Sequence, residues 1–278
     1  MRKFIFIALV FSAQFSLAQP AVDIVVQGDD SNPSLMFLPG FTTPGSVWDA
    51  TIEQLPGEYR THVVSYAGFA GMAPIELPWY DSLTEELLAY IDANDLQNLT
   101  IIGHSMGGTL ALELAVERPE QISGLVLVDS LPNMLAVVMP GVTADQLFLE
   151  SPYNTRMLAM TDEQMAGMAQ MQAQTMAISE EHHAQLAEWI MVADRETYVY
   201  GYTELLKLDL RGDLDRIKAR ALVLGTSFPD VDAIRSNLES QYDLLENKRI
   251  VQAETARHFI MLDEPDWFYA QLTEFLRN

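Results

Sequence analysis

The 278-residue chain contains no cysteine, few basic residues and, beyond its N-terminal segment, no apolar run long enough to form a transmembrane helix. Without cysteine, a disulfide scaffold, a zinc ribbon, an iron–sulfur cluster and a thiol nucleophile are all excluded. The chain has 16 Lys and Arg against 39 Asp and Glu, a formal net charge of −23. Such an acidic surface repels nucleic acid and anionic lipid headgroups, so we expect neither as a partner. Self-repulsion also favours a monomer or a weak homodimer.

The first 18 residues have the pattern of a signal peptide. Arg2 and Lys3 precede the apolar run 4–11, and Ser16-Leu17-Ala18 is a small-x-small cleavage site. The run is too short for a bilayer, which takes about 20 residues. We therefore expect cleavage after Ala18, a periplasmic or secreted protein, and no stable membrane insertion afterwards. An uncleaved membrane anchor is the alternative.

The remaining chain alternates short apolar runs with longer segments of helical periodicity, which predicts an α/β fold with a mostly parallel central sheet flanked by helices. The expected strands are 22–26, 34–38, 61–66, 99–102, 125–128, 221–224 and 249–251. The expected helices are 83–91, 107–117 and 266–276.

Residues 132–210 interrupt this alternation, because they show helical patterning and no convincing strand. The segment holds nine of the 14 methionines, namely Met134, Met139, Met157, Met160, Met165, Met168, Met171, Met176 and Met191. Methionine at helical spacing packs helices together, but its flexible thioether can also line a deformable apolar pocket. We expect a helical insertion between two parts of a core, 19–131 and 211–278.

Gly103-His104-Ser105-Met106-Gly107 matches the pattern G-x-S-x-G, with an apolar strand before it and a helix after it. This setting is typical of a nucleophile elbow, a sharp turn that exposes a serine and needs small neighbours. A serine hydroxyl needs a general base, and the base needs an orienting group. The sequence therefore makes Ser105 a candidate nucleophile.

Among the five histidines, His258 is the best candidate base, because it follows the last strand and precedes the C-terminal helix. His62 lies in a predicted strand as a packing residue, and His104 points away from the Ser105 side chain within the elbow. His182 and His183 are adjacent on a helix, so they face different ways and do not form a metal pair.

Four motifs together resemble the α/β-hydrolase superfamily: Phe-Leu-Pro-Gly-Phe at 37–41, the elbow at 103–108, Val-Leu-Val-Asp at 126–129 and His-Phe-Ile at 258–260. The resemblance covers about 22–278 and implies an α/β-hydrolase fold whose helical cap is the insertion at 132–210. It also implies Ser105 as nucleophile, His258 as base, and an oxyanion hole formed by the backbone N–H groups of Phe41 and Met106.

The position of the catalytic acid departs from the family pattern. The family places an aspartate three residues beyond a glycine after the penultimate core strand, and Phe228 stands at that position here. Asp129, at the end of the strand before the insertion, is the favoured alternative, since some members carry the acid there. Asp230 remains open as the second candidate.

These residues predict an exported serine hydrolase that cleaves an ester of a small or medium apolar acid, with no metal or organic cofactor. An amide- or peptide-cleaving hydrolase is the alternative, and it would need a carboxylate such as Glu150 or Glu204 to hold an amino group. A third hypothesis is a ligand-binding homologue that has lost catalysis.

Overall fold

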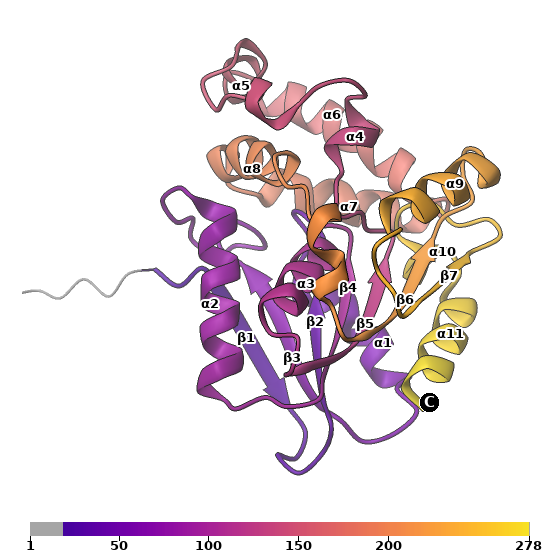
Figure 1. The fold of residues 1–278 in the computed structure, drawn as a ribbon. Helices are drawn as coiled ribbons and strands as arrows, with labels where there is room; N and C mark the ends of the chain where they lie inside the picture. Colours follow the sequence, from indigo (N-terminus) through magenta and orange to yellow (C-terminus); the bar gives the residue numbers. More distant parts are fainter. Residues whose placement is uncertain (1–18, 278) are drawn as a thin grey trace, which may run out of the picture.

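The computed structural model describes residues 19–277, so the predicted signal peptide lies outside the described residues. Seven strands form one sheet in the order β1-β3-β2-β4-β5-β6-β7 (Figure 1). β1 is antiparallel to β3, and all other neighbours are parallel, which confirms the predicted fold class. The strands are β1 Val22–Gln27, β2 Ser34–Leu38, β3 Arg60–Tyr66, β4 Leu99–His104, β5 Ile122–Val128, β6 Arg220–Gly225 and β7 Lys248–Gln252.

The central strands are apolar along their length because helices cover both faces of the sheet. Every residue of β4 is buried, and in β5 only Ser123 is exposed. Alternate residues of one strand enter opposite layers, so Met36 packs on one face of β2 and Phe37 on the other. One layer contains α2 (Trp79–Ala93), α3 (Met106–Glu117) and α9 (Val231–Gln241), and the other contains α1 (Asp49–Glu53) and α11 (Pro265–Arg277).

The segment between β5 and β6 contains helices and no strand, as the sequence predicts. Its helices are α4 Leu135–Val138, α5 Pro152–Leu158, α6 Asp162–Met176, α7 Glu180–Val192 and α8 Tyr202–Leu206. The segment leaves the sheet at the carboxyl end of β5, and Figure 1 shows α4, α5 and α6 stacked beyond this end of the sheet. These inserted helices therefore stand over the edge where parallel-sheet proteins place their ligands.

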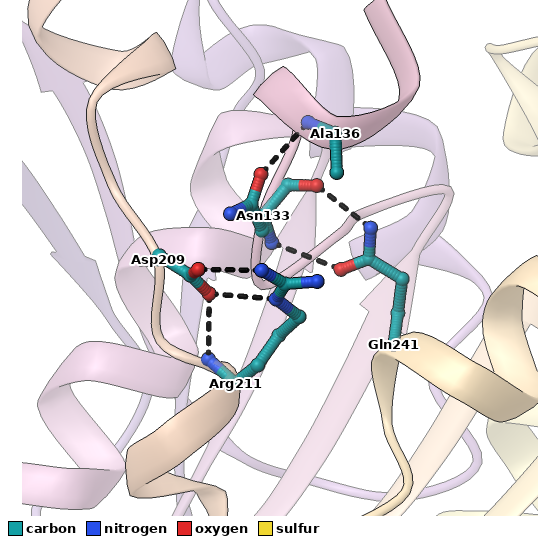
Figure 2. A network of polar contacts seen from close by, with 5 residues as sticks. All are labelled: Asn133, Ala136, Asp209, Arg211 and Gln241. Carbon is teal, nitrogen blue, oxygen red and sulfur yellow. Dashed lines mark hydrogen bonds and ion pairs between the residues drawn. The ribbon is translucent and has the colours of Figure 1, made fainter. Parts of the chain in front are cut away.

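Polar contacts lie where the inserted helices leave the core and where they rejoin it (Figure 2). Gln241 of α9 accepts from the Asn133 N–H at 3.1 Å and donates to the Asn133 carbonyl at 2.8 Å. The Asn133 side chain accepts from the Ala136 N–H at the start of α4. At the other crossing, Asp209 and Arg211 pair through two hydrogen bonds of 2.6 and 2.8 Å. The bonds between Asn133 and Gln241 thus tie the start of the insertion to α9. The Leu210 N–H donates to the Pro132 carbonyl at 3.0 Å and joins the two ends of the insertion.

Among the described residues, three helices outside the insertion were not predicted from the sequence. The short helix α1 follows a 3₁₀ turn at Gly45–Trp48, and α9 begins at the N-cap Asp230. Between the last strand and α11 lies the four-residue helix α10, Ile260–Asp263. Within residues 19–277, no helix combines the length and the hydropathy that a membrane span requires.

Candidate active site

Ser105 occupies the turn between β4 and α3 with φ 53° and ψ −122°. A positive φ is strained for a residue with a side chain, so the surrounding structure must hold it. The Ser105 N–H donates to the Val128 carbonyl at 2.9 Å, and the Ser105 carbonyl accepts from Gly108 at 2.9 Å. The geometry is that of the predicted strand–turn–helix elbow.

The two glycines of the motif are required by close backbone contacts. A Cβ on Gly103 would lie 2.4 Å from the Gly107 carbonyl oxygen, and a Cβ on Gly107 would lie 2.2 Å from that of Leu38. Any side chain at either position would therefore displace the backbone of the turn. Glycine at these positions lets β2, β4 and α3 approach closely enough to form the elbow.

His258 and Asp129 form a direct pair, although they are 129 residues apart. His258 Nδ1 lies 2.6 Å from Asp129 Oδ2, and the two side chains are 28% and 24% exposed. A carboxylate only accepts hydrogen bonds, so Nδ1 carries a proton, and in the neutral imidazole Nε2 is then the nitrogen with the lone pair. That tautomer is the one a general base needs. Asp129 has a φ of 43°, which turns its side chain out of the end of β5.

Asp230, the second candidate acid, performs a different task in the structure. Its carboxylate accepts from the backbone N–H groups of Asp232 at 3.1 Å and Ala233 at 3.0 Å. It is thereby the N-cap of α9, and capping places its oxygen over the helix end. The structure thus brings Asp129, and not Asp230, to His258.

His104 supports the loop that carries His258. Its Nε2–H donates to the His258 carbonyl at 3.0 Å, and its ring packs against the rings of His258 and Phe259 with centroids 4.6 and 4.5 Å away. The side chain is fully buried, and burial lowers the pKa of His104 well below its usual value. A neutral His104 therefore fixes the backbone of the neighbouring histidine, a contact that its position in the motif did not predict.

The two predicted oxyanion donors lie close to Ser105. Met106 follows it in the chain, and Phe41 follows Gly40, where a Cβ would lie 3.3 Å from the Ser105 Cβ. Met106 is the first residue of α3, where a backbone N–H has no partner within the helix. Within residues 19–277, the N–H groups of Phe41 and Met106 donate to no protein acceptor. The Phe41 ring packs against Phe69, Trp79, Tyr198 and Tyr202 at 4.8 to 5.9 Å between centroids, and this packing holds the loop after β2 in place.

A cavity of about 130 Å³ lies between this site and the inserted helices. Phe41, Ser105 and His258 line it from the core, while Gln172, Met176 and other residues of the inserted helices close it from the opposite side. Within the described part of the chain, the lining contains no Lys, Arg, Asp or Glu. The cavity is smaller than the roughly 300 to 1,000 Å³ of drug-sized ligand sites, so it suits a small and uncharged group.

The other residues considered from the sequence lie away from this cavity. His62 is buried in β3, and its Nδ1 lies 2.7 Å from the Tyr90 hydroxyl. His183 Nε2–H donates to the Ala177 carbonyl, and His182 Nε2 lies 3.4 Å from Glu181 Oε1. Glu204 accepts from the Tyr80 N–H at 2.9 Å at the start of α2, and Glu150 is exposed.

The methionines of the insertion divide between the two expected roles. Met134 and Met176 line the cavity, whereas Met157 and Met165 are buried in the helix packing and Met171 is 65% exposed. Within residues 19–277, His, Asp and Glu side chains form no group of three or more that could hold a metal ion.

The fold and the arrangement of the site define an α/β hydrolase. Residues 35–271 match the alpha/beta hydrolase family, and the chain belongs to that family. The resemblance inferred from the motifs is therefore confirmed.

Two curated relatives and one solved structure are similar to this chain. Pimeloyl-[acyl-carrier protein] methyl ester esterase of Aeromonas hydrophila is 32% identical over 120 residues, which is 41% of this chain and 44% of that enzyme. N-formylmaleamate deformylase of Pseudomonas putida is 25% identical over 87% of this chain and 88% of its own. The enol-lactonase of Burkholderia xenovorans has a TM-score of 0.76 at 18% identity, covering 92% and 96% of the two chains. The chain thus spans less than half the length of the Aeromonas esterase and most of the deformylase. The enol-lactonase shows the fold.

Proposed function

We propose that this chain is a serine hydrolase that cleaves the carboxylic ester of a small or medium apolar acid through an acyl-enzyme. The observation that carries the proposal is the 2.6 Å pair of His258 and Asp129 at a cavity that Ser105 also lines. A nucleophile, a base in the required tautomer and an orienting carboxylate thus lie at one site.

In the proposed reaction, Ser105 Oγ attacks the ester carbonyl while His258 Nε2 takes its proton. Asp129 stabilises the resulting imidazolium, and the Phe41 and Met106 N–H groups stabilise the oxyanion, where one such donor is worth about 3–4 kcal/mol. The imidazolium then protonates the leaving alcohol. A water deprotonated by His258 then attacks the acyl-enzyme. His258 returns that proton to Ser105 Oγ as the bond to the acyl group breaks and the acid leaves. No cofactor takes part in these reaction steps.

The size and chemistry of the cavity support the substrate class. At about 130 Å³ with a mostly apolar lining, it accommodates a short acyl chain better than a long one. The rate of hydrolysis of methyl esters from acetate to octanoate tests this, and we expect an optimum at a short chain length. A preference that rises steadily to octanoate would contradict it.

An amide substrate is the alternative, and it is supported by the similarity to a deformylase over most of the chain. Glu204 already accepts from the Tyr80 N–H at the start of α2, and Glu150 is exposed. Both observations argue against recognition of a substrate amino group by either residue. Comparing turnover of methyl butyrate with that of butyramide distinguishes the two bonds.

Covalent labelling with a fluorophosphonate, followed by peptide mass mapping, tests the nucleophile. We expect the label on Ser105 and none in a Ser105→Ala variant that keeps its fold. A folded protein that takes no label and hydrolyses no ester would instead support a ligand-binding homologue.

We also propose that the chain is exported, with residues 1–18 removed, and that it is a monomer or a weak homodimer. The N-terminal charge pattern and the net charge of −23 support these points. The N-terminal sequence of the protein recovered from a bacterial periplasm or medium should begin at Gln19. Sedimentation at several concentrations measures the oligomeric state.

A further inference from the structure

Gln172 presents a polar side chain to a mostly apolar part of the cavity wall. It lies on the same stripe of α6 as the buried residues Met165 and Ala169 and the cavity residue Met176, at helical spacing. A polar group that is taken out of water needs a hydrogen-bond partner or a ligand, and the Gln172 side chain is half-buried beside the cavity. The packing of α6 therefore does not by itself account for Gln172.

The amide of Gln172 is oriented by a second residue of the inserted helices. Tyr198, on the π-helical turn Thr197–Gly201, donates its hydroxyl hydrogen to Gln172 Oε1 at 3.2 Å. Burial raises the pKa of Tyr198 to about 12, so the hydroxyl stays protonated and remains a donor. With Oε1 occupied, Nε2 and its two hydrogens are left over, and within residues 19–277 they donate to no protein acceptor.

The charges around the cavity decide which acceptor suits this donor. No described Lys or Arg lines the cavity, and the chain as a whole carries a charge of −23. A carboxylate bound there would lose its hydration without gaining a counter-ion, which is strongly unfavourable. A neutral oxygen loses far less on burial and regains a hydrogen bond from Nε2.

We propose that Gln172, oriented by Tyr198, is a specificity-determining residue whose Nε2–H donates to a neutral oxygen in the acyl group of the substrate. The preferred substrates are then small esters whose acyl chain carries an ether, keto or ester oxygen in addition to the scissile carbonyl. This inference rests on the proposed ester hydrolysis at Ser105.

The test uses two methyl esters that differ by one atom, methyl methoxyacetate and methyl butyrate. The ether oxygen of the first replaces a CH₂ of the second, so their shapes match while only one offers the additional acceptor. For each protein, kcat/KM is measured by titrating the released acid, and the ratio of the two values is compared between variants. Comparing ratios cancels the different intrinsic reactivities of the two esters.

The informative variant is Gln172→Glu, because it is isosteric and can still accept from Tyr198 but cannot donate when ionised. We expect the ratio to fall about three- to tenfold, as for the loss of one neutral hydrogen bond. Gln172→Leu should lower the ratio similarly, mainly through KM, and Tyr198→Phe should lower it less. The control is Gln170→Leu, on the exposed side of α6, which should leave the ratio unchanged.

An unchanged ratio in Gln172→Glu and Gln172→Leu, with both esters still hydrolysed, would overturn this inference and leave the proposed hydrolase intact. A wild-type preference for monomethyl succinate over methyl methoxyacetate would also overturn it, because that acyl chain carries a carboxylate. If the wild type hydrolyses no ester and Ser105 takes no fluorophosphonate label, the proposed function itself fails, and the inference fails with it.

Discussion

Replacing Asp129 by asparagine isolates the part that this carboxylate plays at His258. Asn tolerates a positive φ better than most residues, so the φ of 43° at this position should persist in the variant. The side chain keeps its size and loses its charge. Its amide can also donate to His258 Nδ1, which would move the imidazole proton to Nε2 and leave no base facing Ser105.

The expected loss follows from that change of tautomer and from the 2.6 Å contact. When the acid of a serine–histidine–carboxylate triad is replaced by its amide, turnover falls by about 10⁴. At about 1.36 kcal/mol for each factor of ten, this is about 5.5 kcal/mol of transition-state stabilisation. The partial exposure of both side chains admits water to the pair, so we expect a loss of about 10³- to 10⁴-fold in kcat.

The assay is initial-rate hydrolysis of methyl butyrate together with the rate of fluorophosphonate labelling, and both should fall in Asp129→Asn. The matched control is Asp230→Asn. Asn caps a helix as well as Asp does, so this variant should keep both its rate and its stability. An Asp129→Asn enzyme within tenfold of wild type, beside an inactive Asp230→Asn enzyme, would refute the assignment.

Three further predictions concern Gly107, His62 and His104. Gly107→Ala should destabilise the protein by more than about 3 kcal/mol in urea unfolding, since its Cβ would meet a backbone oxygen at 2.2 Å. The control is Gly167→Ala in the open middle of α6, which should raise the free energy of unfolding by up to about 1 kcal/mol. Burial lowers the pKa of His62 to about 4, so its contribution to folding is complete above pH 6.5 and is lost as the pH falls toward 4. The urea midpoint should therefore drop less between pH 7 and pH 5 in His62→Gln than in the wild type. His104→Phe, which keeps a ring but loses the donor to the His258 carbonyl, should lower kcat about three- to tenfold while Ser105 still takes the label; an unchanged kcat would show that this bond does not position the base.

The elements predicted best were those whose signals are local. The apolar strand before Ser105 and the helix after it are contiguous in the chain, so the elbow is encoded within about 20 residues. The helix α9 was missed because only Leu238 and Gln241 are buried in it, which leaves a weak apolar stripe. The short α1 is below the length at which periodicity can be recognised.

The acid could not be assigned from the sequence, because Asp129 and Asp230 both follow core strands. Their different tasks come from the backbone around them: a positive φ turns Asp129 toward the His258 loop, and the start of α9 holds Asp230. Gln172 offered a signal in principle, as a polar residue on an apolar stripe of α6. Its partner Tyr198 is 26 residues away on another element, so no spacing rule connects the two.

The sequence by itself determined the α/β class, the helical insertion and the elbow at Ser105, because hydrophobic periodicity and glycine placement act over one or two turns of chain. The tertiary structure alone decided which carboxylate reaches His258, how small the cavity is, and that the Gln172 side-chain amide faces this cavity. Those features depend on side chains that are distant in the chain and meet only when the sheet, the His258 loop and the inserted helices pack together.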